Sequence, residues 1–541
     1  MTAQTSPPQL ESNRLLFAGT PVLKTCLILA GWIAITLGGS TTRAQECVAD
    51  SVTVGYRDFA FGGGDVTSAP TEEKPESKLW WHDGLWWAVL WDHDSQRYTI
   101  HTFDRANQCW LRVGPEADER PRSSSDALWD GKKLYIASRA KMTHKPEHGP
   151  ESARLYRYSY DSGTKSYHLD PGFPMQINDS RSRALVLTKD SAGKLWATWV
   201  QEDDVMINHT DGDDLSWGTP VVLPVQGNDV DTIDISAVLA FGGDRIGVFW
   251  GNQIDKKYYF AVHIDTRLAA DWEPREVVLG DGMARFADDH INLASSASSG
   301  FVFAVVKTSL VGSERPRILL MKRHPGNRVW TSHVVGLGKD DHTRPIVLFD
   351  SENDSLYVFA RVKFKNAIYL KSAHMDDPTF SEGIGRPFIQ STTDSDVNNP
   401  TSTKQTVSSE TGLLVVAGDR LTKFYLHNYL NLRNTPVVVE DRASVGNHPD
   451  RFELLRNHPN PFNPTTTIRY TLAAASEVTL TIYNTLGQQV RTLAKGRQPA
   501  GAYRVQWDSR DSAGKLVVSG VYLYSLKAGS LVQTRTMVLA R

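Results

Sequence analysis

Two copies of the tripeptide Asp-Asp-His, at 288–290 and 340–342, are the residues in this sequence whose types and spacing best suit chemistry. A histidine can act as a general base near neutral pH, and a neighbouring carboxylate can orient its ring. His290 and His342 are therefore candidate catalytic bases. The alternative is structural, because a motif found in two successive repeats can be a repeat signature whose aspartates cap a turn.

Arginine, aspartate and amide side chains recur at comparable places in other parts of the chain. Guanidinium groups can neutralise a uronate carboxylate, as proton abstraction beside a carboxylate requires. Aspartate oxygens also suit Ca²⁺. The chain has no EF-hand or zinc-ligand spacing, so no cofactor is expected, with Ca²⁺ as the alternative. The candidate ligand-binding residues are Arg181, Arg183, Asn252, Asp289, Asp341, Arg344, Arg361 and Asn399.

These residues recur because the body of the chain, 46–432, is repetitive. Each unit contains about four short β-rich runs separated by Gly, Asp, Asn and Ser. Four-stranded sheets bury both faces when they are arranged radially, so the pattern predicts a seven-bladed β-propeller, with six blades as the alternative. The run Ser51–Phe59 is expected to complete the last blade. An aromatic residue marks successive units at intervals of 50–58 residues, namely Trp110, Tyr167, Trp217, Trp272, Trp330 and Phe380.

One turn suggests a family. The stretch Thr-Asp-Gly-Asp-Asp-Leu-Ser-Trp at 210–217 resembles a degenerate Asp-box, the turn between the third and fourth strands of sialidase-like propellers. The body as a whole resembles exported sialidase-like proteins of the BNR type, a group that includes polysaccharide lyases. The resemblance implies that the candidate residues converge on one funnel. Lyases of this group use His, Tyr and Arg. A sialidase is disfavoured because no Tyr–Glu pair stands out.

The C-terminal segment 453–541 has a different pattern. The run Val478–Tyr483 alternates apolar and polar residues, and glycines punctuate the short strands, as in a small Ig-like β-sandwich. Together with Asn460-Pro-Phe-Asn-Pro464, this segment closely resembles type IX secretion sorting domains with a FlgD-like fold. That resemblance implies outer-membrane secretion machinery as a partner. The alternative is an Ig-like module on a protein that is exported by another route. Residues 433–452 are expected to form a linker.

Residues 1–44 have the pattern of a signal peptide. Basic residues precede an apolar run from Cys26 to Gly39, and a small residue lies before Gln45. The apolar run is short for a membrane span, so no transmembrane segment is expected in the mature chain. An uncleaved anchor is the alternative. In an exported protein the two remaining cysteines, Cys47 and Cys109, are expected to form a disulfide, with two separate thiols as the alternative.

The composition argues against nucleic-acid binding. The net charge of -2 provides no field to attract nucleic acid. We therefore expect an all-β protein that is secreted or held on the outer surface of a Gram-negative bacterium. Its funnel is expected to bind carbohydrate or another extracellular ligand. Two alternatives stay open. One is a polysaccharide-active enzyme, a lyase before a glycoside hydrolase, and the other is a structural or adhesive surface protein.

Overall fold

The computed structural model describes residues 50–62, 70–141, 152–296, 300–391 and 395–432 of the N-terminal body. In the C-terminal part it describes 452–455, 457, 460, 462–499 and 501–540. The predicted signal peptide and almost all of the predicted linker lie outside these residues. Within them, no helix has both the length and the apolar character needed to cross a membrane.

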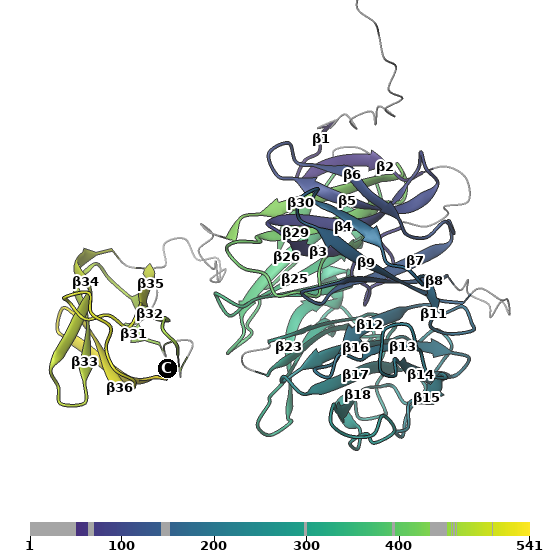
Figure 1. Ribbon diagram of the computed structural model, residues 1–541. Coiled ribbons are helices and arrows are strands. Elements are labelled where there is room, and N and C mark those ends of the chain that lie inside the picture. The colour runs from purple at the N-terminus through teal and green to yellow at the C-terminus, as the bar shows by residue number, and fades with distance from the viewer. Residues whose placement is uncertain are drawn as a thin grey trace, which may run out of the picture. The chain divides into compact units, whose positions relative to one another are not determined.

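Between Asp50 and Leu430 the described residues form seven antiparallel sheets of four or five strands, numbered here sheet 1 to sheet 7 (Figure 1). Sheet 1 contains β3 (Leu79–His82), β4 (Leu85–Asp92), β5 (Arg97–Asp104) and β6 (Cys109–Glu116). Sheet 2 contains β7 (Ser123–Trp129), β8 (Leu134–Ala140), β9 (Arg154–Asp161), β10 (Ser166–Leu169) and β11 (Met175–Gln176). Sheet 3 contains β12 (Leu185–Lys189), β13 (Leu195–Gln201), β14 (Asp204–His209) and β15 (Val221–Val222).

The remaining sheets follow in chain order. Sheet 4 contains β16 (Ser236–Phe241), β17 (Arg245–Asn252), β18 (Lys257–Ile264) and β19 (Glu276–Leu279). Sheet 5 contains β20 (Ile291–Ser295), β21 (Val302–Lys307), β22 (Pro316–Arg323) and β23 (Trp330–Leu337). Sheet 6 contains β24 (His342–Asp350), β25 (Ser355–Val362), β26 (Ala367–His374) and β27 (Arg386–Ile389), with the 3₁₀ turns η1 (Gly338–Asp340) and η2 (Lys363–Lys365). Sheet 7 contains β28 (Val397–Thr401), β29 (Leu413–Asp419), β30 (Phe424–Leu430), β2 (Tyr56–Ala60) and β1 (Asp50–Ser51).

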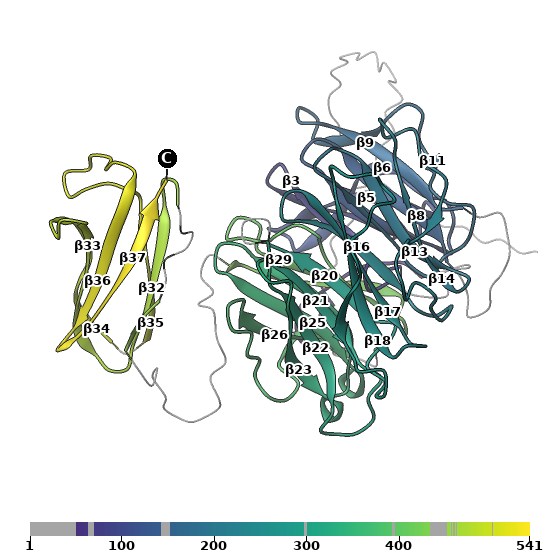
Figure 2. The same ribbon diagram turned by 90° about the horizontal axis from the view of Figure 1, so that it is seen from below.

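The first strand of each sheet, from β3 through β28, is an inner strand. It lies at the end of its sheet's strand order and contacts the inner strands of neighbouring sheets, so the arrangement is propeller-like (Figures 1 and 2). The inner strands run in the same direction. Thr343 at the start of β24 contacts His290 just before β20, and Ser295 at the end of β20 contacts Ala240 near the end of β16. The axis therefore has one end where the inner strands begin and another where they end.

Sheet 7 closes the body with a strand from the N-terminal side. β2 pairs antiparallel with β30, as expected for the run 51–59. Sheet 7 also bonds to sheet 1, where the Leu79 amide donates to the Ser402 carbonyl at 3.1 Å. Pairing of residues so far apart in the chain joins the first and last parts of the body.

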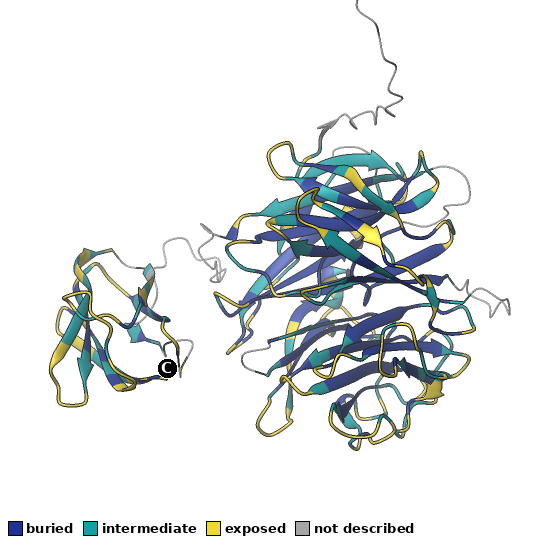
Figure 3. Cartoon of the chain, viewed as in Figure 1, coloured by how far each residue is buried: buried dark blue, intermediate teal, exposed yellow. Residues whose placement is uncertain are grey.

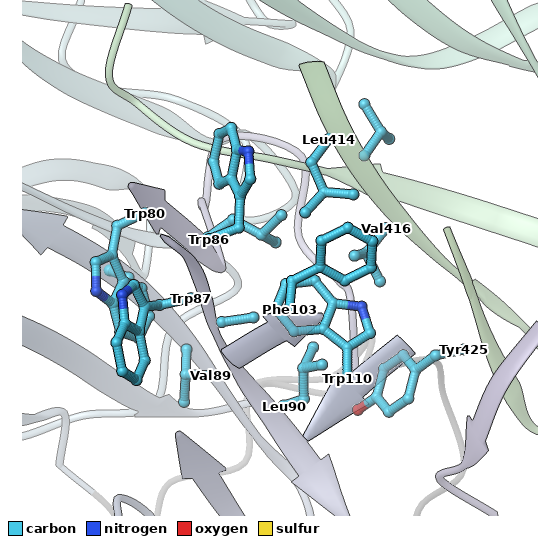
Figure 4. Packing of buried hydrophobic residues seen from close by; sticks show 14 of the residues in the cluster. Trp80, Trp86, Trp87, Val89, Leu90, Phe103, Trp110, Leu414, Val416 and Tyr425 are labelled. Atoms are coloured by element: carbon cyan, nitrogen blue, oxygen red, sulfur yellow. The ribbon is translucent and has the colours of Figure 1, made fainter. Parts of the chain in front are cut away.

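Tryptophan side chains fill the core between sheets 1 and 7. Trp86 and Trp91 are fully buried, and they belong to one cluster with Leu414 and Tyr425. Figure 4 shows Trp86, Leu414 and Tyr425 of this cluster. The Trp86 indole donates to the Thr411 carbonyl at 2.9 Å. The Trp-rich run at 80–91 therefore packs mainly in the core between sheets, as the sequence favoured. Many residues in the strands of the body are buried (Figure 3).

Cys109, at the start of β6, is disulfide-bonded. The other two cysteines, Cys26 and Cys47, lie outside the described residues. The pairing of Cys109 with Cys47 therefore stays a prediction.

The C-terminal part is a β-sandwich with its own core. Its buried residues come from both sheets and include Ile468, Ile482 and Trp507. Alternation in β33 places Val478 and Leu480 inside, as the sequence predicted. One sheet contains β31 (Glu453–Leu454), β32 (Thr466–Leu472) and β35 (Gly501–Trp507). The other contains β34 (Gln489–Gln498), β33 (Ser476–Asn484), β36 (Gly520–Ala528) and β37 (Leu531–Leu539).

Candidate functional site

The segment Thr71–Lys78, directly ahead of β3, bonds to the inner strands of several sheets. The Ser77 amide donates to Asp126 of β7 at 2.8 Å, and the Asn292 side chain of β20 donates to the Lys74 carbonyl at 2.9 Å. The Asn399 side chain of β28 donates to the Glu72 carboxylate at 2.9 Å. Bonds to sheets 2, 5 and 7 place this segment at the axis. We call it the axial segment.

Glu76 of the axial segment is a buried counter-charge. Its carboxylate accepts from Lys78 at 2.9 Å and from Arg139 at 2.6 Å, and it also accepts from the Ser124 hydroxyl at 2.7 Å. Burial raises the pKa of Glu76, but the charges of Arg139 and Lys78 outweigh it and lower the pKa to about 2. The Leu185 amide donates to the same carboxylate at 3.2 Å. Glu76 therefore joins sheets 2 and 3 through charge-assisted bonds.

His290 lies between the two aspartates that precede it. Its Nδ1 is 2.5 Å from a carboxylate oxygen of Asp288 and 2.5 Å from one of Asp289. Its Nε2 is 3.3 Å from the Thr343 hydroxyl, and the residue is only 5% exposed. Burial raises the pKa of Asp289, but His290, Lys74 and Arg183 together hold it well below its usual range. The ring is thus held on both sides.

Separate cations neutralise the two carboxylates. Lys307 donates to Asp288 at 2.9 Å, and Arg183 reaches from sheet 3 to donate to Asp289. Lys74 of the axial segment lies 3.6 Å from Asp289. We call these residues, with His290, the axial charge cluster. The three nearest ligand atoms of Asp288, Asp289 and His290 lie within 4.8 Å of one another, as a cation site needs. The bound lysine and arginine groups already occupy those oxygens, so the cluster does not fit Ca²⁺.

His342 is placed differently, although its tripeptide is the same. Its Nε2 is 3.1 Å from the Ile384 carbonyl, and its ring packs so closely on Gly336 that a Cβ there would lie 2.4 Å from Nδ1. Burial lowers the pKa of His342 to about 4. It is Thr343, the next residue along the strand, that contacts His290, because successive strand residues point to opposite faces. The structure does not bring the two histidines together. Asp341 lies in the preceding turn, partly exposed, 3.8 Å from Lys363.

Arg344 is the candidate residue with the least satisfied side chain. It occupies the left-handed region, with φ 53°, inside an irregular stretch of β24 between Thr343 and Ile346. Among the described residues its side chain makes no hydrogen bond or ion pair, and its Nε is buried without a partner. Arg361 is close enough for the two positive charges to repel. Arg361 itself donates to Asp396 at 2.5 Å.

The other sequence-predicted residues have structural contacts. The Asn252 side chain donates to the carbonyls of Gly227 and Asp229, at 3.2 Å and 2.8 Å, and it accepts from the Asp255 amide at 2.7 Å in the turn after β17. Asn399 is bonded to the axial segment. Arg181 lies partly buried in the segment before β12, two residues before Arg183. The structure brings Arg183, Asp289 and His290 into contact, and their role in binding a ligand stays a prediction.

Sequence reasoning missed the axial segment and a cavity. The segment contains Glu-Glu-Lys-Pro-Glu-Ser-Lys at 72–78, a charged run of a kind that is most often solvated. The cavity, about 560 Å³, runs along several inner strands to their ends and is lined in part by Trp129, Lys189, Ala240 and Ser295. Its lining comes from several sheets, so only the assembled ring reveals it.

Comparison with known proteins identifies one domain. Residues 463–531 match the family model of the FlgD Ig-like domain, which agrees with the sandwich. No curated protein matches. The propeller resembles solved structures, three of which have identities of 10–12% and TM-scores of 0.35–0.43.

The first of these structures is PorZ, described as an essential bacterial surface component of the type IX secretion system of Porphyromonas gingivalis. It is 12% identical, with a TM-score of 0.35, and the match covers 89% of this chain and 61% of that one. This chain thus spans about three-fifths of PorZ. Polysaccharide lyase Uly1 is 10% identical, with coverage of 72% and 95% and a TM-score of 0.43. The periplasmic gluconolactonase PpgL of Pseudomonas aeruginosa is 12% identical, with coverage of 76% and 96% and a TM-score of 0.41. These likenesses carry no argument about activity.

Proposed function

We propose that this chain is a secreted or cell-surface protein whose seven sheets are the blades of a propeller, and that its funnel binds an acidic carbohydrate. The observation that carries the proposal is Arg344, whose guanidinium has no hydrogen bond or ion pair among the described residues. The funnel is the end of the axis where the inner strands begin. The residues nominated for the ligand are Arg344 and Arg361, with Asp341 just before β24 and Arg181 in the segment before β12.

The chemistry of Arg344 points to an anion. A guanidinium presents several donors in a planar fork that matches a carboxylate or a sulfate. Leaving that group unpaired beside a second arginine is unfavourable until an anion arrives. The left-handed backbone of Arg344 also costs free energy, and such strain gathers at functional sites. A uronate or sulfated sugar would give Arg344 the partner that Arg361 already has in Asp396.

A lyase with His290 as base is the second candidate. The observation in its favour is the pair of aspartates that orient the imidazole. Against it, a general base must reach the substrate proton, and His290 is buried with Nε2 directed at Thr343. His342 is a weaker candidate, because its ring is packed on Gly336. These residues therefore favour ligand binding over catalysis.

Export through the C-terminal domain is the other half of the proposal. Segment 453–541 would act as a sorting domain read by outer-membrane secretion machinery, which would place the mature chain outside a Gram-negative cell. The match of residues 463–531 to a FlgD Ig-like domain is consistent with this role. We also propose that the propeller is related to sialidase-like proteins of the BNR type. Deleting 453–541 should leave the propeller inside the cell in a fractionation assay, and normal export of the truncated chain would contradict a sorting role.

The binding proposal is tested by affinity electrophoresis of the full mature chain in gels that contain polygalacturonate, alginate or a sulfated polysaccharide. A neutral glucan gel serves as the control. We expect at least one acidic polymer to retard the wild type, and Arg344→Ala to restore most of the mobility. Arg328→Ala is the matched control, because Arg328 also has a left-handed φ, of 58°, but pairs with Glu273 at 2.8 Å.

Two results would count against binding at the funnel. One is migration that no acidic polymer changes, and the other is equal retardation of wild type and Arg344→Ala. The lyase candidate is read in the same samples from the ultraviolet absorbance of an unsaturated product. Absorbance that grows with the wild type and disappears in His290→Ala would establish the second candidate instead.

A further inference from the structure

The cavity described above runs along four inner strands and reaches the end of the axis where these strands end. Its lining begins at Val186 of β12, Ala237 of β16 and Asn292 of β20 and extends to the last residues of the strands, among them Trp129 of β7, Lys189 of β12 and Ser295 of β20. Arg344, by contrast, lies three residues into sheet 6, where β24 begins. Arg344 is not among the residues that line the cavity.

Two strand edges form one wall of the cavity. β16 and β20 each lie at the end of a sheet's strand order, so one edge of each has no strand partner. Residues Ala237–Ala240 and Asn292–Ser295 line the cavity along those edges. Unpaired edges present alternating N–H donors and C=O acceptors. The Ser295 hydroxyl already donates to the Ala240 carbonyl at 3.3 Å, so the wall can hold a hydroxyl group. The many alanines let a ligand come close to this backbone.

Trp129 supplies an aromatic surface at the rim. Its side chain is only partly buried, although the other large aromatics near it are packed in the core. The His82 ring packs against Trp129 with centroids 3.9 Å apart, which fixes the orientation of the indole. A held, partly exposed indole beside backbone donors and acceptors suits the flat apolar face of a pyranose ring.

Two of the three lysines that line the cavity are compensated within the protein, and the third, Lys132, is exposed to solvent. Lys189 donates to Asp130 at 2.8 Å and to the Tyr135 hydroxyl at 2.8 Å. Lys404 is paired with the buried Asp126. Because Lys189 and Lys404 are already paired, only the exposed Lys132 is left to attract an anion. Arg344 differs, since it has no counter-charge among the described residues.

We propose that this cavity is a second ligand site, which binds a neutral mono- or disaccharide with one sugar ring stacked on Trp129. Its volume of about 560 Å³ falls in the range of small-molecule pockets, about 300–1,000 Å³. Ring hydroxyls would bond to the edges of β16 and β20. The inference goes beyond the acidic-carbohydrate site and rests on different residues, so either site can fail alone.

The test is saturation-transfer NMR of the full mature chain with maltose, cellobiose, lactose and xylobiose, followed by calorimetry of any sugar that binds. We expect at least one of these disaccharides to bind. Trp129→Ala should weaken that binding about tenfold or more, in line with loss of a stacked ring. Trp129→Phe keeps an aromatic ring and should lose only a few-fold, which covers the case in which the alanine variant folds poorly.

Two matched variants complete the design. Phe364→Ala removes an aromatic side chain that is 58% exposed in η2, outside the cavity, and should bind like the wild type. Arg344→Ala should also bind these neutral sugars like the wild type, which separates this site from the acidic-carbohydrate site. Absence of saturation transfer from all four disaccharides would overturn the inference. So would unchanged affinity in folded Trp129→Ala or Trp129→Phe.

Discussion

The two ends of the axis are built from the same inner strands but satisfy their polar groups in different ways. Where the strands begin, Glu76 and Asp288 are buried, Asp289 is partly buried, and each is held by lysine or arginine. A cavity of about 560 Å³ runs along the inner strands to their ends, where its lining includes the partly exposed Trp129. The beginning of the strands is thus occupied by paired charges, whereas a cavity remains at their ends.

This difference distinguishes side chains that only lie close together at the axis from side chains that are available to bind a ligand. In a ring of sheets many side chains reach the axis, and their proximity alone does not make a site. The axial charge cluster uses its charges on the protein itself, because buried charges need partners. Arg344 is the exception at that end, since its guanidinium lacks a partner in the described part of the chain. The same criterion favours Arg344 over His290 as the group left available for a ligand.

The largest expected effect comes from removing the counter-charge at the filled end. Glu76→Gln leaves Lys78 and Arg139 buried without their carboxylate, which should lower the free energy of unfolding by about 3–5 kcal/mol. Urea unfolding followed by tryptophan fluorescence measures it. Glu119→Gln is the control, because that carboxylate is 61% exposed and its pairing with Arg97 should be worth less than about 1 kcal/mol. Equal stability of the two variants would mean that the axial charges do not hold the ring.

Low pH should destabilise the fold through the buried carboxylates at the end of the axis where the inner strands begin. The pKa values of Glu73 and Glu76 are about 2 in the folded chain, against 4.5 for an unperturbed glutamate, because nearby cations outweigh burial. A carboxyl group with a lowered pKa stabilises the fold above pH 4.5, and that stability is lost as pH falls toward 2. For one such group the loss is on the order of 3 kcal/mol.

Unfolding free energies measured from pH 6 to pH 2 test this pH dependence. The wild type should lose stability steeply below pH 4.5, and Glu76→Gln should show a shallower slope. A slope that Glu76→Gln leaves unchanged would show that other carboxyl groups govern acid unfolding.

A smaller effect, of opposite sign, is expected at Arg344. Glycine adopts a left-handed backbone without strain, so Arg344→Gly should raise the free energy of unfolding by up to about 1 kcal/mol. The comparison is Arg328→Gly, which gains the same backbone relief but loses the pair with Glu273, so its net change should be near zero or less favourable. Thermal unfolding of both variants decides this. A clearly destabilised Arg344→Gly would mean that the arginine side chain already has a structural role.

Much of the fold was predictable because the relevant signals are local. Alternation in the run 478–483 predicted the sandwich strand, and recurrent aromatic residues predicted the four-stranded units. The run 51–59 was expected to complete the last sheet, and β2 does pair with β30. Trp86 and Trp91 were correctly favoured as core residues, since large aromatics between sheets are buried more often than not.

The candidate site was predictable only in part. The grouping of Arg183, Asp289 and His290 follows from their equivalent places ahead of inner strands. The different roles of His290 and His342 do not, because they depend on which neighbour each ring meets, Asp288 or Gly336. The position of the axial segment could not be predicted from the sequence for a similar reason. Its charges are buried by partners from distant sheets, such as Arg139, and no local pattern shows that pairing.

The most direct test of the central claim is calorimetry of a short galacturonate oligosaccharide with the full mature chain, at low and at high salt. The account predicts that the wild type binds, that salt weakens the binding, and that Arg344→Gly loses at least tenfold in affinity together with most of the salt dependence. It also predicts that Arg328→Gly matches the wild type. Equal affinity and equal salt dependence in wild type and Arg344→Gly would contradict the claim that the unpaired guanidinium reads an acidic sugar.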